Sequence, residues 1–240
     1  MTQDSIVNLD VLILCGGFGT RLKEIEKSRP KPMVEVHGHP FLDILIQYAS
    51  SHGFRRFILC TGFKSEVIEQ YFSEKNDGNT YVISKEQEAL GTGGGIKNAE
   101  MCILSSPFMV LNGDSICRIN LKDFIEFHEV NNATASMVLA TVDDVRGYGS
   151  VAINDKHEIE GFDEKSNLIR GPGTVNAGIY LFEKKIMNEI PTKQKISLEY
   201  ELLPLLIGQR LFGFATEERL FDIGTPARLE LLRNNFLTTG

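Results

Sequence analysis

The sequence lacks tryptophan, has only four cysteines among its 240 residues and carries no excess of positive charge. Its formal net charge is −7, so no general basic field is present that could hold a nucleic acid, and none is expected as a partner. No apolar run approaches the roughly 18 residues that cross a bilayer, so no membrane partner is expected either. The polar segment 1–8 does not have the pattern of a signal peptide, and we expect a cytoplasmic protein.

The cysteines are too widely spaced to supply the ligand pairs of a zinc site. None of Cys15, Cys60, Cys102 and Cys117 belongs to a C-x-x-C pair. Cys15 and Cys60 each end an apolar run, which is typical of buried thiols. We therefore expect free, buried thiols in a reducing compartment.

What the sequence does contain is an alternation of short apolar runs with segments of helical periodicity. The runs predict strands, and the segments between them, with apolar residues three and four positions apart, predict helices. The expected strands are 11–14, 57–60, 81–83, 108–111 and 135–140, and the expected helices are 41–51, 64–72 and 121–130. Continuous apolar strands separated by helices indicate an α/β fold whose parallel sheet is covered on both faces.

The pattern changes after about residue 140. Strand-like segments at 150–153, 158–162 and 175–182 are separated by turn residues, which predicts a mixed sheet with hairpins. Thr225 followed by Pro226 is a typical helix start and predicts a final helix.

A glycine-rich turn follows the first predicted strand. Gly16, Gly17 and Gly19 precede Thr20 and Arg21, and such glycines let backbone N–H groups approach a phosphate. The spacing matches neither the dinucleotide pattern G-x-G-x-x-G nor the Walker A pattern. On its own, the turn fits phosphate binding and tight packing equally well. The guanidinium of Arg21 favours phosphate, because it can hold two phosphate oxygens at once.

Two further segments carry groups suited to a nucleotide. Pro30 and Pro32 fix the backbone around Lys31, whose ammonium would be a second phosphate ligand near the glycine turn. Gln87, which lies shortly before Gly91, offers both a donor and an acceptor to the edge of a base. Taken alone, each segment also fits a solvated loop or a flexible linker.

Two carboxylates are expected beside these segments. Asp114 follows Asn112 and Gly113 at the end of a predicted strand, the edge at which open α/β sheets bind their ligands. Asp222 lies much later in the chain, before Gly224. Mg²⁺ usually takes one or two carboxylates together with substrate phosphates. Although a single aspartate is more often a turn or cap residue, two acids, two cations and two glycine-rich segments together predict a nucleoside triphosphate bound with Mg²⁺.

Taken in order, these motifs resemble those of the sugar-1-phosphate nucleotidylyltransferases, over about residues 10–236. The chain reads G-G-F-G-T-R-L from Gly16, P-K-P-M from Pro30, E-A-L-G-T-G-G from Glu88, N-G-D-S from Asn112, V-N-A-G-I-Y from Val175 and D-I-G-T-P from Asp222. Within this family the chain is most similar to the D-glycero-α-D-manno-heptose 1-phosphate guanylyltransferases, through residues 14–17, 90–94, 111–115 and 197–201. Residues 31–35 are also similar to the glucose-1-phosphate cytidylyltransferases.

The resemblance implies a Rossmann-like, three-layer α/β fold with a mixed, mostly parallel central sheet. It implies one domain over residues 1–240, with a nucleotide-binding half at about 9–140 and a sugar-phosphate-binding half at about 141–240. The apolar segment 202–214 is either core or the interface of a homodimer.

The resemblance also implies roles for individual residues. Arg21, Lys31 and Asp114 would be catalytic, and Asp114 and Asp222 would hold Mg²⁺. The implied nucleotide contacts are Leu14, Gly16, Gly17, Gly19, Thr20, Gln87, Gly91, Thr92, Asn112 and Gly113. The implied sugar-phosphate contacts are Tyr148, Gly149, Glu164, Lys165 and Asn176, although Ser166 departs from a Glu-Lys-Pro pattern common in the family.

The implied reaction is Mg²⁺-dependent transfer of a nucleoside monophosphate from a triphosphate to a sugar 1-phosphate, for surface polysaccharide synthesis. GTP and the manno-heptose 1-phosphate are the expected substrates, and Glu86 or Glu88 would suit guanine. Cytidylyl, uridylyl or thymidylyl transfer to another hexose 1-phosphate stays open. A non-catalytic sensor would lack the cations and acids that this chain has, and a dinucleotide-dependent oxidoreductase would need the G-x-G-x-x-G pattern.

Overall fold

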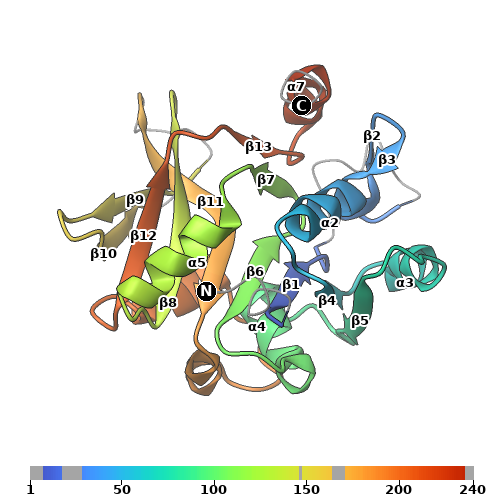
Figure 1. Cartoon of the computed structure of the whole chain (residues 1–240), viewed down its shortest axis with the longest axis horizontal. Helices are drawn as coiled ribbons and strands as arrows, with labels where there is room; N and C mark the ends of the chain where they lie inside the picture. The colour runs from blue at the N-terminus through green and yellow to red at the C-terminus, as the bar shows by residue number, and fades with distance from the viewer. Residues whose placement is uncertain (1–7, 18–28, 146–147, 164–170, 236–240) are drawn as a thin grey trace.

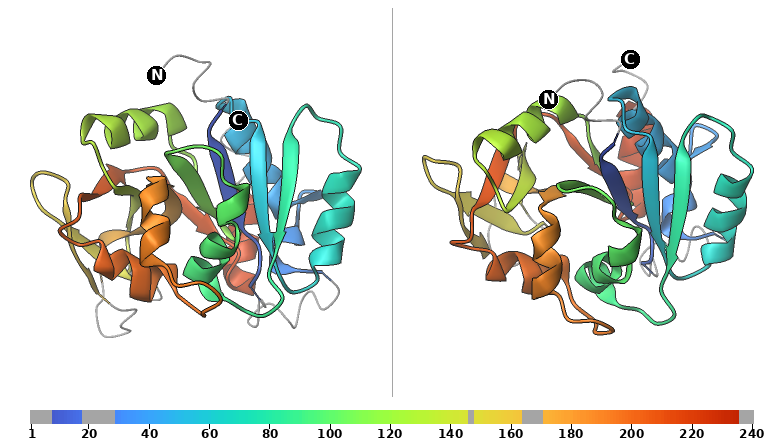
Figure 2. Two further views of the ribbon diagram at one scale, coloured as in Figure 1. Left: turned by 90° about the horizontal axis from the view of Figure 1, so that it is seen from below. Right: turned by 60° about the horizontal axis from the view of Figure 1, so that its bottom comes forward.

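The computed structural model describes residues 8–17, 29–145, 148–163 and 171–235 (Figure 1). Within them, four strands form the parallel part of the main sheet, in the order β5-β4-β1-β6. They are β1 (Asp10–Leu14), β4 (Arg56–Thr61), β5 (Thr80–Lys85) and β6 (Phe108–Asn112). Figure 2 shows β1, in dark blue, between its neighbours β4 and β6. The parallel sheet predicted from the first half of the chain is confirmed.

The second half of the chain extends the same sheet and makes it mixed. β11 (Gly173–Phe182) runs antiparallel to β6 and to β8 (Ala135–Val142), while β12 (Leu211–Thr216) pairs parallel with β8. The hairpin of β9 (Ser150–Ile153) and β10 (Ile159–Asp163) joins at β11. Residues from both halves therefore share one continuous sheet.

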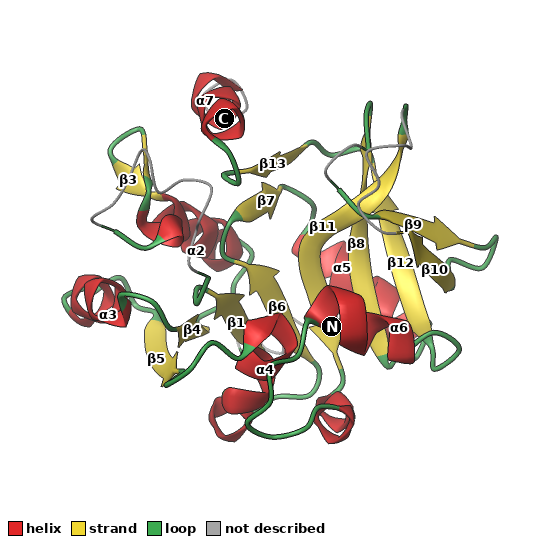
Figure 3. Ribbon diagram, turned by 180° about the vertical axis from the view of Figure 1, so that it is seen from behind, coloured by secondary structure: helices red, strands yellow, loops and turns green. Residues whose placement is uncertain are grey.

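Helices cover both faces of this sheet, as the apolar strands predict (Figures 1 and 3). α2 (Phe41–Ser51), α3 (Ser65–Ser73), α5 (Leu121–Val130) and α7 (Pro226–Asn235) pack in one core with Val11 and Ile13. α4 (Gly91–Asn98) and α6 (Leu203–Leu205) pack in a second core with Leu12. Alternate residues of β1 thus face opposite cores, because side chains alternate along a strand.

Short elements complete the described chain. They are the 3₁₀ helices η1 (Lys31–Met33), η2 (Glu100–Cys102) and η3 (Lys184–Glu189), the π-helical turn η4 (Leu198–Leu202), and the strand pairs β2 (Glu35–Val36) with β3 (His39–Pro40) and β7 (Ser115–Cys117) with β13 (Leu220–Asp222). The last pair links the end of the chain to the segment that follows β6.

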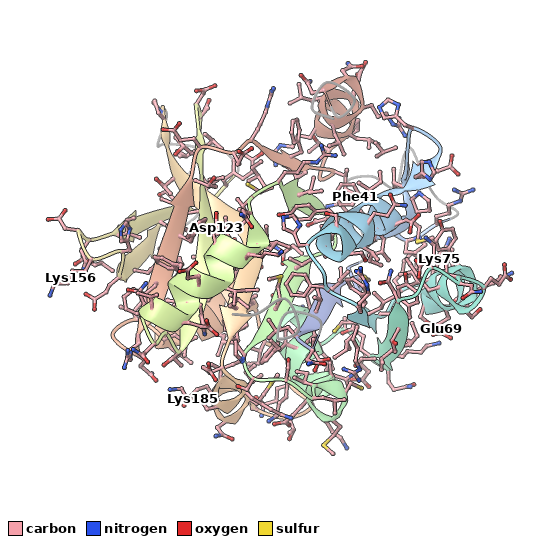
Figure 4. The ribbon with its side chains drawn as sticks, viewed as in Figure 1. Phe41, Glu69, Lys75, Asp123, Lys156 and Lys185 are labelled. Atoms are coloured by element: carbon pink, nitrogen blue, oxygen red, sulfur yellow. The ribbon has the colours of Figure 1, made fainter. Side chains whose placement is uncertain are left out.

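Local chemistry explains where several helices start and how they are held. The side chain of Asn120 accepts a hydrogen bond from Lys122 N at the start of α5, and Thr225 Oγ1 accepts one from Arg228 N at the start of α7. The buried carboxylate of Asp43 on α2 pairs with Lys75. Lys75 follows α3, where Figure 4 labels it. This ion pair ties two neighbouring helices together.

The segment 202–214 is partly core and partly surface, and Leu205 and Ile207 are exposed. Leu202, Leu203 and Leu206 are buried, and β12 adds the buried Leu211 to the edge of the main sheet. The cysteines are free, and three of them are buried, whereas Cys102 is partly exposed. Over the described ranges, no helix combines the length and apolar character needed to cross a bilayer.

Candidate active site

A cavity of about 800 Å³ opens at the carboxyl ends of β1 and β6. Its wall is assembled from segments that are far apart in the sequence. They include the end of β1, the turns after β5 and β6, the start of α4, the strand β9 and the segment between β13 and α7. The position agrees with the general rule that ligands of α/β sheets bind beyond the carboxyl ends of the strands.

The glycine-rich turn after β1 forms one wall. Leu14, Gly16 and Gly17 line the cavity. Cys15 N donates a hydrogen bond to Cys60 O over 2.8 Å, which anchors the start of the turn to β4. Gly19, Thr20 and Arg21, which the sequence assigns to the triphosphate, lie outside the described residues.

Beside this turn lies the carboxylate of Glu86, which follows β5. A Cβ on Gly16 would come within 2.7 Å of Glu86 Oε1, and a Cβ on Gly62 would also collide with that oxygen. Two glycines therefore make the room that this carboxylate occupies. Glu86 Oε2 accepts a hydrogen bond from Leu90 N over 3.2 Å, and burial raises the pKa of the Glu86 carboxyl. The neighbouring Gln87, which the sequence assigns to the base, is exposed and is not part of the cavity lining.

Lys31 and Asp114 meet at the floor of the cavity. Lys31 opens η1 between its two prolines, and its Nζ lies 2.5 Å from Asp114 Oδ2. The turn after β6 brings Asp114 there, because Gly113 N donates to Leu14 O over 3.1 Å. A Cβ on Gly113 would lie 2.5 Å from that same Leu14 oxygen, so this close approach requires glycine.

Asp222 is adjacent to Asp114 although it comes from the far end of the chain. β13 pairs Asp222 with Ser115, and Ile223 N donates to Asp114 O over 2.9 Å. Asp222 Oδ2 accepts hydrogen bonds from Tyr148 OH at 2.8 Å and Arg228 Nη1 at 3.0 Å. Burial, with the charge of Asp222, raises the pKa of Tyr148.

The two aspartates suit a metal ion that the substrate's phosphates also ligate. The described residues hold no group of three or more His, Cys, Asp or Glu side chains that could bind a metal without such help. Asp114, whose side chain is 44% exposed, offers carboxylate oxygen to the cavity next to Asp222. A hard divalent cation with one or two carboxylates and several phosphate oxygens fits this donor set.

The run Gly91–Gly94 at the start of α4 is shaped by protein packing. Gly93 N and Gly94 N both donate to Ile196 O, and a Cβ on Gly91 would lie 2.5 Å from that oxygen. Thr92 Oγ1 accepts from Leu198 N and donates to Glu199 Oε2 over 2.8 Å. Gly91 and Thr92 line the cavity as the sequence implies, and their immediate role is to seat the segment 194–199.

The second half of the chain contributes Tyr148, Gly149 and Asn176 to the lining. Asn176 Nδ2 donates to Tyr180 OH over 2.7 Å, and burial raises the pKa of this tyrosine. Asn112 also lines the cavity, and its Oδ1 is buried without a hydrogen-bond partner. Glu164 and Lys165 lie outside the described residues.

Several lining residues have no assigned role in the sequence analysis. Among them are Lys195, Glu199, Tyr200 and Arg228. The sequence analysis uses segment 197–201 only as part of the family resemblance. Glu199 could have been identified there, because a carboxylate inside a family motif is a candidate ligand-binding group. Arg228 has a weaker signal: a cation in the first turn of a helix, where acids are preferred.

Three comparisons place these observations among known proteins. The family model described as "Nucleotidyl transferase" matches residues 10–237. The D-glycero-α-D-manno-heptose 1-phosphate guanylyltransferase of Campylobacter jejuni is 34% identical over 218 residues, which cover 91% of this chain and 96% of that protein. The mannose-1-phosphate guanylyltransferase of Mycobacterium tuberculosis is 34% identical over 224 residues, which cover 91% of this chain. The match spans only 62% of the length of that protein.

The fold has a close counterpart among solved structures. HddC from Yersinia pseudotuberculosis superposes with a TM-score of 0.85 at 36% identity, covering 95% of this chain and 99% of that chain. A second HddC structure, described as complexed with GMP-PN, gives a TM-score of 0.83 at 35% identity with the same coverage.

Proposed function

The chain belongs to the nucleotidyl transferase family, and on that premise we propose that it transfers GMP from GTP to D-glycero-α-D-manno-heptose 1-phosphate. The products would be a GDP-heptose, for surface polysaccharide synthesis, and pyrophosphate. Relatives that match nearly end to end carry the heptose name, and a guanine nucleotide is named in one HddC structure. The four free cysteines are compatible with our proposal that it acts in the cytoplasm.

The choice of guanine rests on the position of the Glu86 carboxylate, which lines the cavity. Guanine presents N1–H and an exocyclic amine side by side, and two oxygens of one carboxylate can accept both. Uracil and thymine present one N–H between two carbonyl groups, whose lone pairs would face the carboxylate. Of the two acids that the sequence offers to guanine, Glu86 lines the cavity, whereas Glu88 is exposed and is not part of its lining.

The proposed reaction needs positioning and charge neutralisation more than a strong base. An oxygen of the sugar phosphate attacks the α-phosphorus of GTP, and the bond from that phosphorus to the β-bridging oxygen breaks as pyrophosphate leaves. The nucleophile is already anionic, so the barrier is mainly one of bringing two polyanions together. We assign Lys31 to the α-phosphate, Arg21 to the departing pyrophosphate and Lys165 to the acceptor.

Nucleotidyl transferases of this family generally use a divalent metal ion. We propose Mg²⁺, held by Asp114 with Asp222. When bound, Mg²⁺ would offset negative charge on the triphosphate. In its absence Lys31 and Arg228 balance the charge of the two aspartates.

The test is pyrophosphate release with Mg²⁺, crossing GTP, CTP, UTP, dTTP and ATP with the 1-phosphates of manno-heptose, mannose and glucose. We expect turnover with GTP and the heptose phosphate to exceed every other pair. Turnover with CTP or dTTP and glucose 1-phosphate would show that the assigned substrates are wrong and that the reaction is still nucleotidyl transfer. Release with no pair would favour a non-catalytic sensor.

A matched pair of variants tests the guanine assignment directly. Glu86→Gln replaces one acceptor oxygen by a donor, so we expect KM for GTP to rise by about ten- to a hundredfold. Glu88→Gln makes the same chemical change at an exposed position and should leave KM for GTP unchanged. Equal effects of the two variants would contradict the assignment of Glu86.

A further inference from the structure

Arg228 stands where helix electrostatics disfavour a positive charge. It lies in the first turn of α7, whose start is capped by Thr225 Oγ1, 3.3 Å from Arg228 N. The partial positive charge at a helix N-terminus repels a guanidinium, so a cation at this position needs compensating partners.

Two such partners hold the guanidinium in a fixed orientation. Arg228 Nη1 donates to Asp222 Oδ2 over 3.0 Å, and the guanidinium carbon lies 4.2 Å from the centre of the Tyr148 ring. Tyr148 OH donates to the same Asp222 oxygen. Ring and carboxylate thus fix the guanidinium from two sides.

The orientation leaves donors for a ligand. Arg228 lines the cavity together with Gly149 and Gly224, and its side chain is 30% exposed. A guanidinium has five N–H donors, and within the described part of the chain the bond to Asp222 uses one of them. The remaining donors suffice for a bidentate contact with two oxygens of a phosphate.

The position of Arg228 favours the acceptor's phosphate over those of the nucleotide. Arg228 stacks on Tyr148, which directly precedes Gly149 and β9 in the acceptor half. Lys31, by contrast, pairs with Asp114 at the turn beside β1. We propose that Arg228 binds the phosphate group of the incoming sugar 1-phosphate and aligns its oxygen for attack, a role that rests on the proposed function.

The experiment compares Arg228→Ala and Arg228→Gln with Arg233→Ala, a control on the same helix whose side chain bonds Glu35 O outside the cavity lining. The acceptor is whichever sugar phosphate turns over. We expect KM for that acceptor to rise by about ten- to a hundredfold in both Arg228 variants, with KM for GTP changed less than about twofold. Inorganic phosphate is tested as a competitor of the acceptor, and its inhibition constant should rise by a similar factor in the Arg228 variants. Arg233→Ala should change none of these values.

Two further measurements separate phosphate binding from a role in merely holding Asp222. Guanidinium chloride at low millimolar concentration should lower KM for the acceptor in Arg228→Ala, because the free cation can replace the missing group. Tyr148→Phe removes the other donor to Asp222 while keeping the ring beneath Arg228, so it should weaken phosphate competition much less than Arg228→Ala does. A fall in kcat alone, a rise in KM for GTP alone, or equal loss of phosphate competition in Tyr148→Phe would overturn the proposal.

The proposal can be tested even if the proposed function fails. If no sugar phosphate turns over, calorimetric titration of the full chain with inorganic phosphate compares the wild type with Arg228→Ala. Loss of phosphate binding in the variant supports Arg228 as a phosphate ligand, whereas unchanged binding overturns it.

Discussion

Each of the two aspartates in the cavity is paired with a cation. Asp114 pairs with Lys31 and Asp222 with Arg228, so neither carboxylate is an isolated charge. A partly exposed pair of this kind contributes little to stability, because solvent screens it. The pairs therefore matter for ligands more than for folding, since a polyanion can draw the cations away and leave carboxylate oxygen for a metal ion.

This balance leads to a prediction for Asp114→Asn. The amide keeps the size of the side chain and removes the charge, so the free energy of unfolding should change by less than about 1 kcal/mol. We expect turnover to fall by about a hundredfold or more, as when other preorganised charged groups are removed. Pyrophosphate release and urea unfolding measure the two effects, with Asp155→Asn in an exposed turn as control. Normal turnover with a native fold would remove Asp114 from the metal site.

At the scale of elements, α4 and the segment 194–199 form a unit. Gly91 has φ +72°, and a Cβ there would lie 2.5 Å from Ile196 O. Gly91→Ala should therefore cost about 2 kcal/mol or more in unfolding free energy, from the left-handed backbone and the collision together. Gly95→Ala is the matched control on the same helix. Its Cβ would meet nothing closer than Leu14 Cδ2 at 3.9 Å, and we expect no loss of stability in urea unfolding.

The longer helices and most strands of the main sheet could be predicted from the sequence, because they depend on local periodicity, whereas β12 was not predicted. The 3.6-residue spacing in α2 and the continuous apolar run of β4 are visible in short windows. The function of the glycine run at α4 could not be predicted in this way. The resemblance implies Gly91 as a nucleotide contact, but it does not reveal the close approach of Ile196 O to this glycine, which no local pattern predicts.

Residues of the cavity lining could be predicted from the sequence only where a family motif contains them. The family motifs mark Lys31, Asp114 and Asp222, but not the contacts between them. Tyr148 and Asp222 are 74 positions apart and meet because β13 pairs with β7. Arg228 escapes sequence reasoning for the same reason, since its role depends on which ring and carboxylate the fold places beside it. Glu86 lines the cavity and the neighbouring Gln87 does not, a one-residue difference that only the turn after β5 decides.

At the scale of the whole molecule, one sheet joins the two halves that contribute to the cavity. β11 pairs with β6 on one side and β8 on the other, so the cavity residues from the two halves of the chain are fixed relative to one another. A site distributed in this way depends on the stability of the entire sheet. Conditions that loosen the second half should therefore affect catalysis as well as folding.

Acid is such a condition, because of a histidine buried between α5 and the sheet. His128 is 2% exposed, its Nδ1 lies 2.8 Å from Ser136 Oγ, and its Nε2 lies 3.6 Å from Glu183 Oε1. Burial lowers the pKa of His128, an effect only partly opposed by the nearby charge of Glu183. The folded state thus keeps the ring neutral at pH values where the unfolded chain binds a proton.

The sign of the pH dependence follows from this depressed pKa. Above the unfolded value of about 6.5 neither state is protonated, and the contribution to stability is constant. As the pH falls below that value, the unfolded state takes up the proton first, and stability declines by up to about 1.4 kcal/mol per pH unit until the folded pKa is reached. Urea unfolding of the wild type and of His128→Gln at pH 7.5 and 5.5 measures this term. The variant should lose less stability than the wild type between the two pH values, since other titrating groups are common to both. An equal loss in the two proteins would show that His128 is protonated as readily in the folded state as in the unfolded chain, and acid sensitivity would then lie in the carboxylates.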